Sequence, residues 1–293
     1  MILLFGYVIV GYCCNKLHIF DEMTNGKLSA FLVKVAMPAT ILASAFRQEG
    51  LELSMIAQAM AMSMGIYVFY ILMSKMLAKL FHWENTVELM LTYSNIMFMG
   101  LPIVRSLYGE AAVFYVVIFV MAFNLWFYTL GIQTLHRGTT QSGTMWKKML
   151  NPGIVAALLA VVIVCLDLPA PDMAVNLLEG VGSVTTPLAM MIIGSQVALV
   201  DIKKVITRWD LYGIAACKLV LYPVVVHLLC RSIMGDGLYT NVATVLAAMP
   251  TAGNVTMLCS EYDGNTSLAA QGTCIATTLS AVTLPVLMYI LGR

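Results

Sequence analysis

Two short groups of proline, glycine and asparagine interrupt hydrophobic stretches of this chain, one in each half of the sequence. Their residues are Asn95, Met99, Gly100 and Pro102 in the first half and Pro250, Thr251, Gly253 and Asn254 in the second. Proline removes a helical hydrogen bond and glycine tolerates non-helical angles, so both stretches are predicted to unwind near their centres. Backbone groups freed in this way cannot face lipid and must face protein, water or a bound solute. The eight residues are therefore candidates for a binding site.

The composition of the chain places these segments in a membrane. The 293 residues are 60% hydrophobic and 11% charged, far from the composition of a soluble domain. We predict ten transmembrane helices, each near the ~20 residues that a bilayer requires. They cover residues 1–15, 28–46, 54–80, 86–107, 112–135, 152–168, 174–199, 209–233, 239–261 and 265–291. The first is short and begins abruptly at Met1, which suggests a truncated start; no small-residue cleavage site follows, so it does not read as a signal peptide.

Lysine and arginine residues divide unevenly between the two sides of the membrane. If the N-terminus lies outside, ten of them flank the cytoplasmic loops and four lie on the opposite side, while Lys34 and Lys218 fall within spans. The positive-inside rule then predicts that both termini lie outside the cytoplasm. We expect a multi-pass protein of the plasma (inner) membrane.

The predicted spans fall into two groups of five. Residues 136–151 form the most polar stretch and read as a cytoplasmic linker between a first repeat, 1–135, and a second repeat, 152–293. Pro38 in the second span and Pro187 in the seventh occupy matching places, where each is expected to break or support its helix. Because five is odd, the second repeat enters the membrane from the opposite side, which gives an inverted repeat. Interrupted helices in matching positions, here the fourth and ninth, mark the binding site of a secondary transporter.

The chemistry expected at a crossing of two broken helices is anion binding. Half-helices that begin there present free N–H groups and a partial positive charge. Asn95 and Asn254 add neutral amides that can donate to a carboxylate, and Ser94, Thr251 and Thr256 offer hydroxyl groups. The structural alternative is that the two amides only satisfy carbonyl groups freed by the breaks. The two roles are compatible.

Charged residues inside the spans narrow the choice of cargo. No Asp or Glu lies in the middle of a predicted span, and Glu88 and Glu261, near span ends, are expected to be solvated. Because a cation exchanger of the carboxylate type would need an intramembrane acid, an organic anion is favoured. Lys34 and Lys218 are candidates for coupling or gating. For Lys218, a bond to freed carbonyls of a broken helix and snorkelling stay open as alternatives.

Several stretches resemble the auxin efflux carrier family. They are N-x-x-x-M-G-L-P at 95–102 with L-Y-G at 107–109, and A-M-P at 248–250 with E-Y at 261–262. The similarity runs along essentially the whole chain and is greatest to the compact prokaryotic branch, which includes malate, malonate and lactate permeases. The resemblance implies an all-α fold like that of sodium/proton antiporters and bile acid carriers. In this fold ten helices form two inverted repeats with crossed, broken helices 4 and 9, and scaffold and crossover domains draw on both repeats. It implies a substrate contact for Asn95 alone.

The function expected from these observations is secondary active or facilitative transport of a small organic anion by alternating access. Malate, malonate, lactate or an auxin-like acid would fit. The alternatives are a sodium-coupled organic anion symporter of the bile acid carrier type and a ligand sensor that does not transport. An enzyme is not expected, since the sequence has no H-E-x-x-H motif. We expect no cofactor, metal site or nucleic acid; H⁺ or Na⁺ coupling stays open, as does a homodimer in the bilayer.

Overall fold

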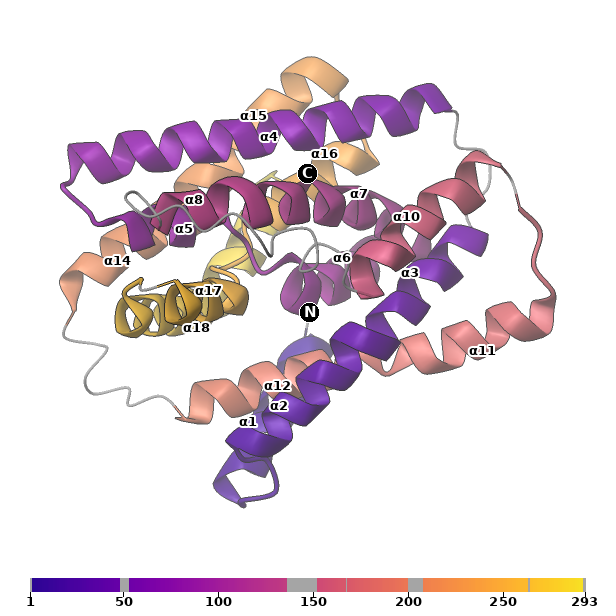
Figure 1. Cartoon of the computed structure of the whole chain (residues 1–293), viewed down its shortest axis with the longest axis horizontal. Coiled ribbons are helices and arrows are strands. Elements are labelled where there is room, and N and C mark those ends of the chain that lie inside the picture. The colour runs from indigo at the N-terminus through magenta and orange to yellow at the C-terminus, as the bar shows by residue number, and fades with distance from the viewer. Residues whose placement is uncertain are drawn as a thin grey trace. The chain divides into compact units, whose positions relative to one another are not determined.

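The computed structural model describes residues 2–47, 53–135, 152–166, 168–199, 208–262 and 264–291. Every regular element in these ranges is a helix, and one isolated antiparallel bridge joins two extended residues (Figure 1). The predicted all-α class is confirmed. The linker predicted at 136–151 lies outside the described residues.

Six helical segments of the described chain are long and apolar enough to cross a bilayer. They are Met23–Phe46, Ser54–Leu80, Glu110–Leu135, Asp172–Leu199, Trp209–Met234 and Thr266–Ile290. Each coincides with a predicted span to within a few residues at its ends. The predicted spans 1–15 and 152–168 correspond to shorter helices, and 86–107 and 239–261 are interrupted. The chain is thus a polytopic membrane protein.

The chain folds into two compact units, and both halves of the sequence contribute to each. Unit 1 comprises Met1–Met60, Met97–Met121 and Leu150–Val200, and unit 2 comprises Ala61–Ile96, Ala122–Met149 and Asp201–Arg293. The helices of unit 1 are α1 (Ile2–Lys16), α2 (Glu22–Phe31), η1 (Leu32–Ala36), α3 (Met37–Phe46), α6 (Leu101–Tyr108), α10 (Pro152–Cys165), α11 (Asp172–Ser183) and α12 (Thr185–Leu199).

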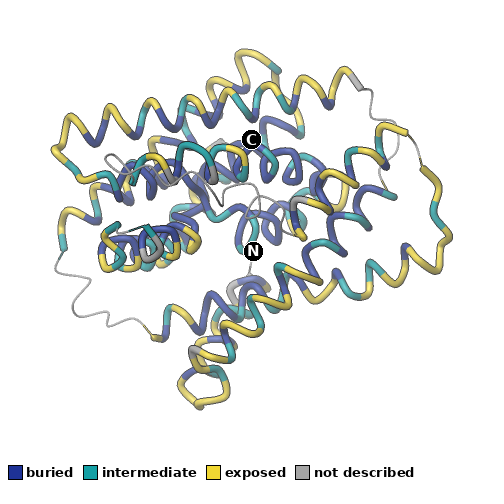
Figure 2. Tube along the Cα trace, viewed as in Figure 1, coloured by how far each residue is buried: buried dark blue, intermediate teal, exposed yellow. Residues whose placement is uncertain are grey.

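Unit 2 contains both breaks of the interrupted helices, at residues 93–95 and 248–252. Its elements are α5 (Asn85–Thr92), η3 (Phe127–Gly131), α8 (Ile132–Leu135), α14 (Trp209–Ala216), η4 (Cys217–Leu221), α15 (Tyr222–Met234), α16 (Leu238–Ala247), α17 (Gly253–Glu261) and α18 (Thr266–Leu291). Three further helices cross the boundary between the units: α4 (Leu53–Leu80), η2 (Ile96–Gly100) and α7 (Glu110–Trp126). Every residue of α5 after Asn85 is buried, and α16 is buried over most of its length (Figure 2). A helix buried on all sides belongs to the interior of its unit.

Small residues set the packing of unit 1, where α1 lies along α12 (Figure 1). A Cβ atom added at Gly11 would lie 1.9 Å from the carbonyl oxygen of Met191, and one at Gly194 would lie 1.9 Å from that of Val8. The two backbones are therefore in direct contact, as is common where helices associate in membranes. The buried hydroxyl of Ser195 accepts hydrogen bonds from the side chains of Asn15 and Asn25 beside this contact.

Three prolines follow a π-helical turn, each as the second residue of the next α-helix. Pro38 follows η1, Pro102 follows η2 and Pro223 follows η4. The wider turn leaves room for the proline ring. It also moves away the carbonyl group to which proline, lacking an N–H, cannot donate. The helix through Pro38 is consequently continuous from 22 to 46, and the break predicted there is absent. Pro187 differs, because a single turn residue, Val184, separates α11 from α12 just before it.

Candidate functional site

The helix breaks of unit 2 occur directly after α5 and α16. Residues 93–95 are extended between α5 and η2, and residues 248–252 separate α16 from α17. The second break contains Pro250, as predicted. The first lies just before the predicted position, because the run from Ile96 to Tyr108 is helical and places Pro102 in the first turn of α6. The π-helical turn at η2 lets the helix continue through that proline.

The structure brings the two breaks together as a short antiparallel pair. Ser94 and Thr251 form the bridge. On either side of it, the N–H of Asn95 donates to the carbonyl of Pro250 at 2.7 Å, and the N–H of Ala252 donates to that of Tyr93 at 2.9 Å. Backbone groups freed in one helix are therefore satisfied by those freed in the other, as the absence of water inside a bilayer requires.

Side chains from distant segments donate hydrogen bonds to carbonyl groups at the end of α5. The last turn of a helix leaves several carbonyls without intrahelical donors. The Thr251 hydroxyl donates to the carbonyl of Met90 at 2.9 Å, and the Lys218 ammonium donates to that of Leu91 at 2.6 Å. Thr251 thus stabilises the crossing, because its hydroxyl proton is used in the hydrogen bond to Met90.

Lys218 is fully buried in η4, with a relative exposure of 0%. Its Nζ lies 5.4 Å from the ring centre of Tyr70 and 5.3 Å from that of Tyr222, within the range of cation–π attraction. Of the roles considered for this lysine, the bond to a freed carbonyl of a broken helix is therefore present. Lys34 is exposed on η1, and its role in coupling or gating stays a prediction.

The amide side chains of Asn95 and Asn254 take no part in these hydrogen bonds. Asn95 is half-buried and Asn254 is exposed. Neither carboxamide makes a hydrogen bond to any residue in the described ranges. Because Thr251 and Lys218 take the freed carbonyls, the amides do not play the structural role that was the alternative reading. Both remain available to a ligand.

The N-terminus of α17 is open beside these amides. The helix begins at Gly253, and the residue before it, Ala252, provides no side-chain cap. A Cβ atom added at Gly253 would meet nothing within 4 Å. The first N–H groups of a helix lack intrahelical partners, so this end combines free donors with the positive end of the helix dipole.

The other predicted contacts divide between the two units. Pro250 is buried and acts through its carbonyl. Met99, Gly100 and Pro102 are buried on the helical run after Asn95 and belong to unit 1. In unit 2, the hydroxyl of Ser94 is buried and has no partner in the described part of the chain, which leaves it free to act at the crossing.

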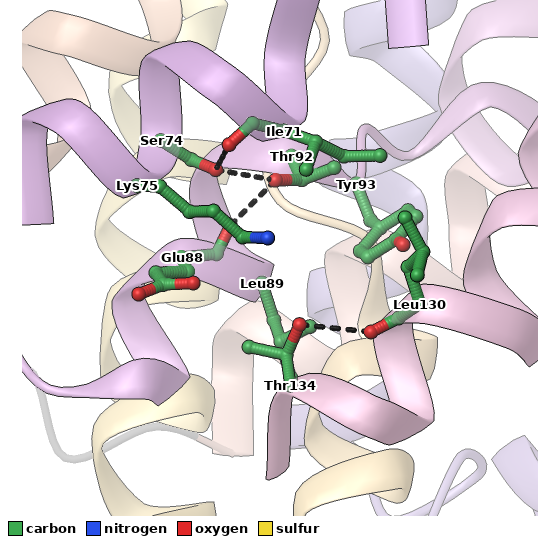
Figure 3. Close-up of a pocket in the computed structure, with 9 residues that line it drawn as sticks. All are labelled: Ile71, Ser74, Lys75, Glu88, Leu89, Thr92, Tyr93, Leu130 and Thr134. Carbon is green, nitrogen blue, oxygen red and sulfur yellow. Dashed lines mark hydrogen bonds between the residues drawn. The ribbon is translucent and has the colours of Figure 1, made fainter. Parts of the chain in front are cut away.

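The expectation that Glu88 is solvated is wrong. Its relative exposure is 7%, and it lines a small cavity in unit 2 (Figure 3). The other lining residues are Ile71, Ser74, Lys75, Leu89, Thr92, Tyr93, Leu130 and Thr134. The Thr92 hydroxyl donates to the Glu88 carbonyl at 2.7 Å and shares a hydrogen bond with Ser74 at 2.9 Å. The spacing of Glu88 and Thr92, four residues apart on one helical face, was the available signal for this polar cluster.

Comparison with known proteins agrees with a transport role for this arrangement of helices. The sequence matches the family described as "Membrane transport protein" over residues 1–288. The chain belongs to this family, which is the auxin efflux carrier family that its motifs resemble. It is a membrane transporter and not an enzyme.

The relatives span nearly the whole chain. A Rhizobium meliloti protein described as "Putative malonate transporter" is 27% identical over 304 residues, which cover 98% of this chain and 93% of the relative. An "Uncharacterized transporter" of Methanothermobacter thermautotrophicus is 23% identical, with 97% and 95% covered. A Methanocaldococcus jannaschii protein, likewise described as an uncharacterized transporter, is 25% identical with the same coverage.

Proposed function

We propose that the chain carries a small organic anion, a carboxylate, and that the anion binds where the two helix breaks meet. The observation that carries the proposal is that the carbonyls of Met90 and Leu91 at the end of α5 already have side-chain donors, while the amides of Asn95 and Asn254 make no hydrogen bond within the described residues. The site therefore offers unpaired amide N–H donors, which can turn toward a ligand. Such donors suit an anion.

The physical character of these donors favours a carboxylate. Neutral amides lose less hydration energy on burial than a cationic side chain would, so the half-buried amide of Asn95 can exist without a ligand. The open end of α17 adds a partial positive charge that falls off within one helical turn. Together they supply several directed N–H donors to two carboxylate oxygens.

Malonate is the first substrate to test. The name of the Rhizobium meliloti relative supports it, and malate, lactate and an auxin-like acid are the further candidates. A dicarboxylate has a second anionic group to place, for which the half-buried amide of Asn95 and the exposed start of α17 offer two separate donors.

The mechanism that we propose is alternating access in a fold of ten helices related as two inverted repeats. The assembly of each compact unit from both halves of the sequence is compatible with scaffold and crossover domains of that kind. The charge distribution supports an orientation with both termini outside the cytoplasm, in the plasma membrane.

Two measurements on the purified protein test the proposal. First, mono- and dicarboxylates are screened for a rise in melting temperature, which a ligand of the folded state produces. Second, uptake of radiolabelled malonate is measured in proteoliposomes with and without a sodium gradient. Uptake without sodium supports the leading proposal, and uptake only with sodium supports a sodium-coupled symporter. A thermal shift without uptake identifies a sensor, and the absence of any carboxylate ligand overturns the proposal.

A further inference from the structure

Lys218 stands apart from the other basic residues of this protein. Among the described residues it is the only lysine or arginine that is buried. No ion pair between it and a carboxylate occurs in the described ranges. A buried ammonium without a carboxylate is held at a large desolvation cost. A lysine in such a place responds readily to a change in the charge around it.

The groups that face the lysine come from three helices. α5 contributes the carbonyl of Leu91, α4 the ring of Tyr70 and α15 the ring of Tyr222. A carbonyl and two aromatic faces stabilise an ammonium, while burial opposes it. Stabilisation by these groups and destabilisation by burial act on the same atom, Nζ. The surroundings therefore permit both the charged and the neutral form of Lys218.

Other titratable groups on the neighbouring elements have positions or partners of their own, and η4 and α18 add the free cysteines Cys217 and Cys274. On α5 and α4, Glu88 and Lys75 line the cavity shown in Figure 3. On α14, Asp210 pairs with Arg208, and on α15, His227 shares a hydrogen bond with Thr244. α18 also packs against η4, and its sequence from 266 to 291 contains no Asp, Glu, Lys, Arg or His.

We propose that Lys218 is the proton-carrying group of this transporter, which takes up a proton when an anion occupies the crossing and releases it when the anion leaves. The inference rests on the proposed function, because it requires an anion at the crossing. The proton passes from water to the lone pair of Nζ and returns to water on release. One proton then accompanies each anion, which makes the carrier a proton–anion symporter.

The position of Lys218 allows this coupling. Its ammonium donates to the carbonyl of Leu91, and the Cα atoms of Leu91 and Asn95, four residues apart, are separated by at most ~14 Å. Across such a distance two charges interact far more strongly in a low-dielectric interior than in water. An anion at Asn95 therefore favours the charged form of Lys218.

The contact with Leu91 is compatible with both charge states. An ammonium has three N–H donors, and a neutral amine still has two. Either form can donate to the Leu91 carbonyl, so the end of α5 remains satisfied when the proton leaves. Loss of the proton changes the charge beside the crossing without removing the hydrogen bond that supports it.

The test counts protons taken up on anion binding. Malonate binding to the purified protein is measured by calorimetry in buffers of different ionisation enthalpy, from about pH 6 to pH 9. The wild type is expected to take up about one proton per malonate within this range. Lys218→Gln keeps a donor for Leu91 without a titrating group. It should take up none and bind malonate roughly tenfold more weakly.

Two further variants separate a proton-carrying role from a structural one. Lys218→Arg keeps a permanent charge, so it should bind malonate with no proton uptake. Lys79→Met removes an exposed lysine of α4 in the same unit and should leave proton uptake unchanged. Proton uptake that persists in Lys218→Gln or Lys218→Arg overturns the inference and points to another group.

A measurement without ligand keeps the inference testable if malonate does not bind. The melting temperatures of the wild type and Lys218→Gln are compared from about pH 6 to pH 9. If Lys218 changes its charge, the difference between the two melting temperatures varies with pH, while Lys79→Met follows the wild type. A difference independent of pH overturns the inference. Failure of malonate binding together with a pH-dependent difference counts against the proposed substrate alone.

Discussion

The backbone N–H of Asn95 donates a hydrogen bond to the carbonyl oxygen of Pro250 across 2.7 Å. These two residues belong to different halves of the sequence, and each lies in a helix break. Their backbones satisfy each other, so the side chain of Asn95 is not needed to hold the crossing together. The same residue therefore supplies a structural contact through its backbone and a free amide for a ligand.

Substitution of Asn95 should separate these two roles. Asn95→Ala keeps the backbone bond, so the melting temperature should change little while malonate uptake falls strongly. Asn95→Asp has the same size but places a negative charge at an anion site, and it should reduce uptake further. Uptake and thermal stability are measured on the same preparations, with Asn176→Ala on the exposed face of α11 as the control. Better uptake in Asn95→Asp than in Asn95→Ala would indicate a cationic cargo.

The hydroxyl of Thr251 should matter for stability more than for recognition. Thr251→Val keeps the shape of the side chain but leaves the buried carbonyl of Met90 without its donor at 2.9 Å. The expected cost is about 1–3 kcal/mol in the free energy of unfolding. Thr278→Val removes an exposed hydroxyl that bonds within α18, and it should be nearly neutral. Equal effects of the two substitutions in denaturant unfolding would contradict the role given to Thr251.

The second backbone bond of the crossing can be removed by a single proline. Ala252 has a φ of −68°, which proline adopts without strain, and its N–H donates to the carbonyl of Tyr93. Ala252→Pro therefore deletes that bond with little change in backbone angle. We expect lower stability, by about 1 kcal/mol, and loss of malonate uptake. Ala252→Val adds bulk but keeps the N–H, and it should retain more uptake in the same proteoliposome assay.

The sequence located the second break well and the first less well. Pro250 lies within the extended segment, where its carbonyl faces Asn95. Pro102 lies in a continuous helical run, because the π-helical turn before it lets the helix continue through the proline. The first break is instead fixed by pairing with a segment from the other half of the chain. Local residue types do not encode such a distant partner.

The buried charged residues Glu88 and Lys218 also show how little local sequence says about distant contacts. Glu88 lies near the end of its predicted span, which indicated contact with water. In the fold its helix ends after Thr92 and is buried on all sides, so nearness to the end of a span says little about depth. For Lys218, position along the span indicated burial correctly, but its acceptor, Leu91, comes from the other half of the chain. Spacing within one helix cannot identify such a contact.

The close contact of α1 with α12 gives a prediction for unit 1. Gly11→Ala would place a Cβ atom 1.9 Å from the carbonyl oxygen of Met191, and two backbones in contact cannot separate without loosening the helix pair. We expect destabilisation of about 1–3 kcal/mol or more, as for other overpacked cores. Gly6→Ala on the same helix meets nothing within 4 Å. It should be neutral or stabilising by about 0.5–1 kcal/mol.

Unfolding of the two glycine variants in a mixed-micelle titration checks this contact, with the yield of monodisperse protein as a second readout. Gly194→Ala approaches the carbonyl of Val8 from the opposite helix and should behave like Gly11→Ala. Because both substitutions report one contact, the double variant should cost less than the sum of the two single costs. A stability of Gly11→Ala equal to that of Gly6→Ala would show that α1 and α12 are farther apart than this packing requires.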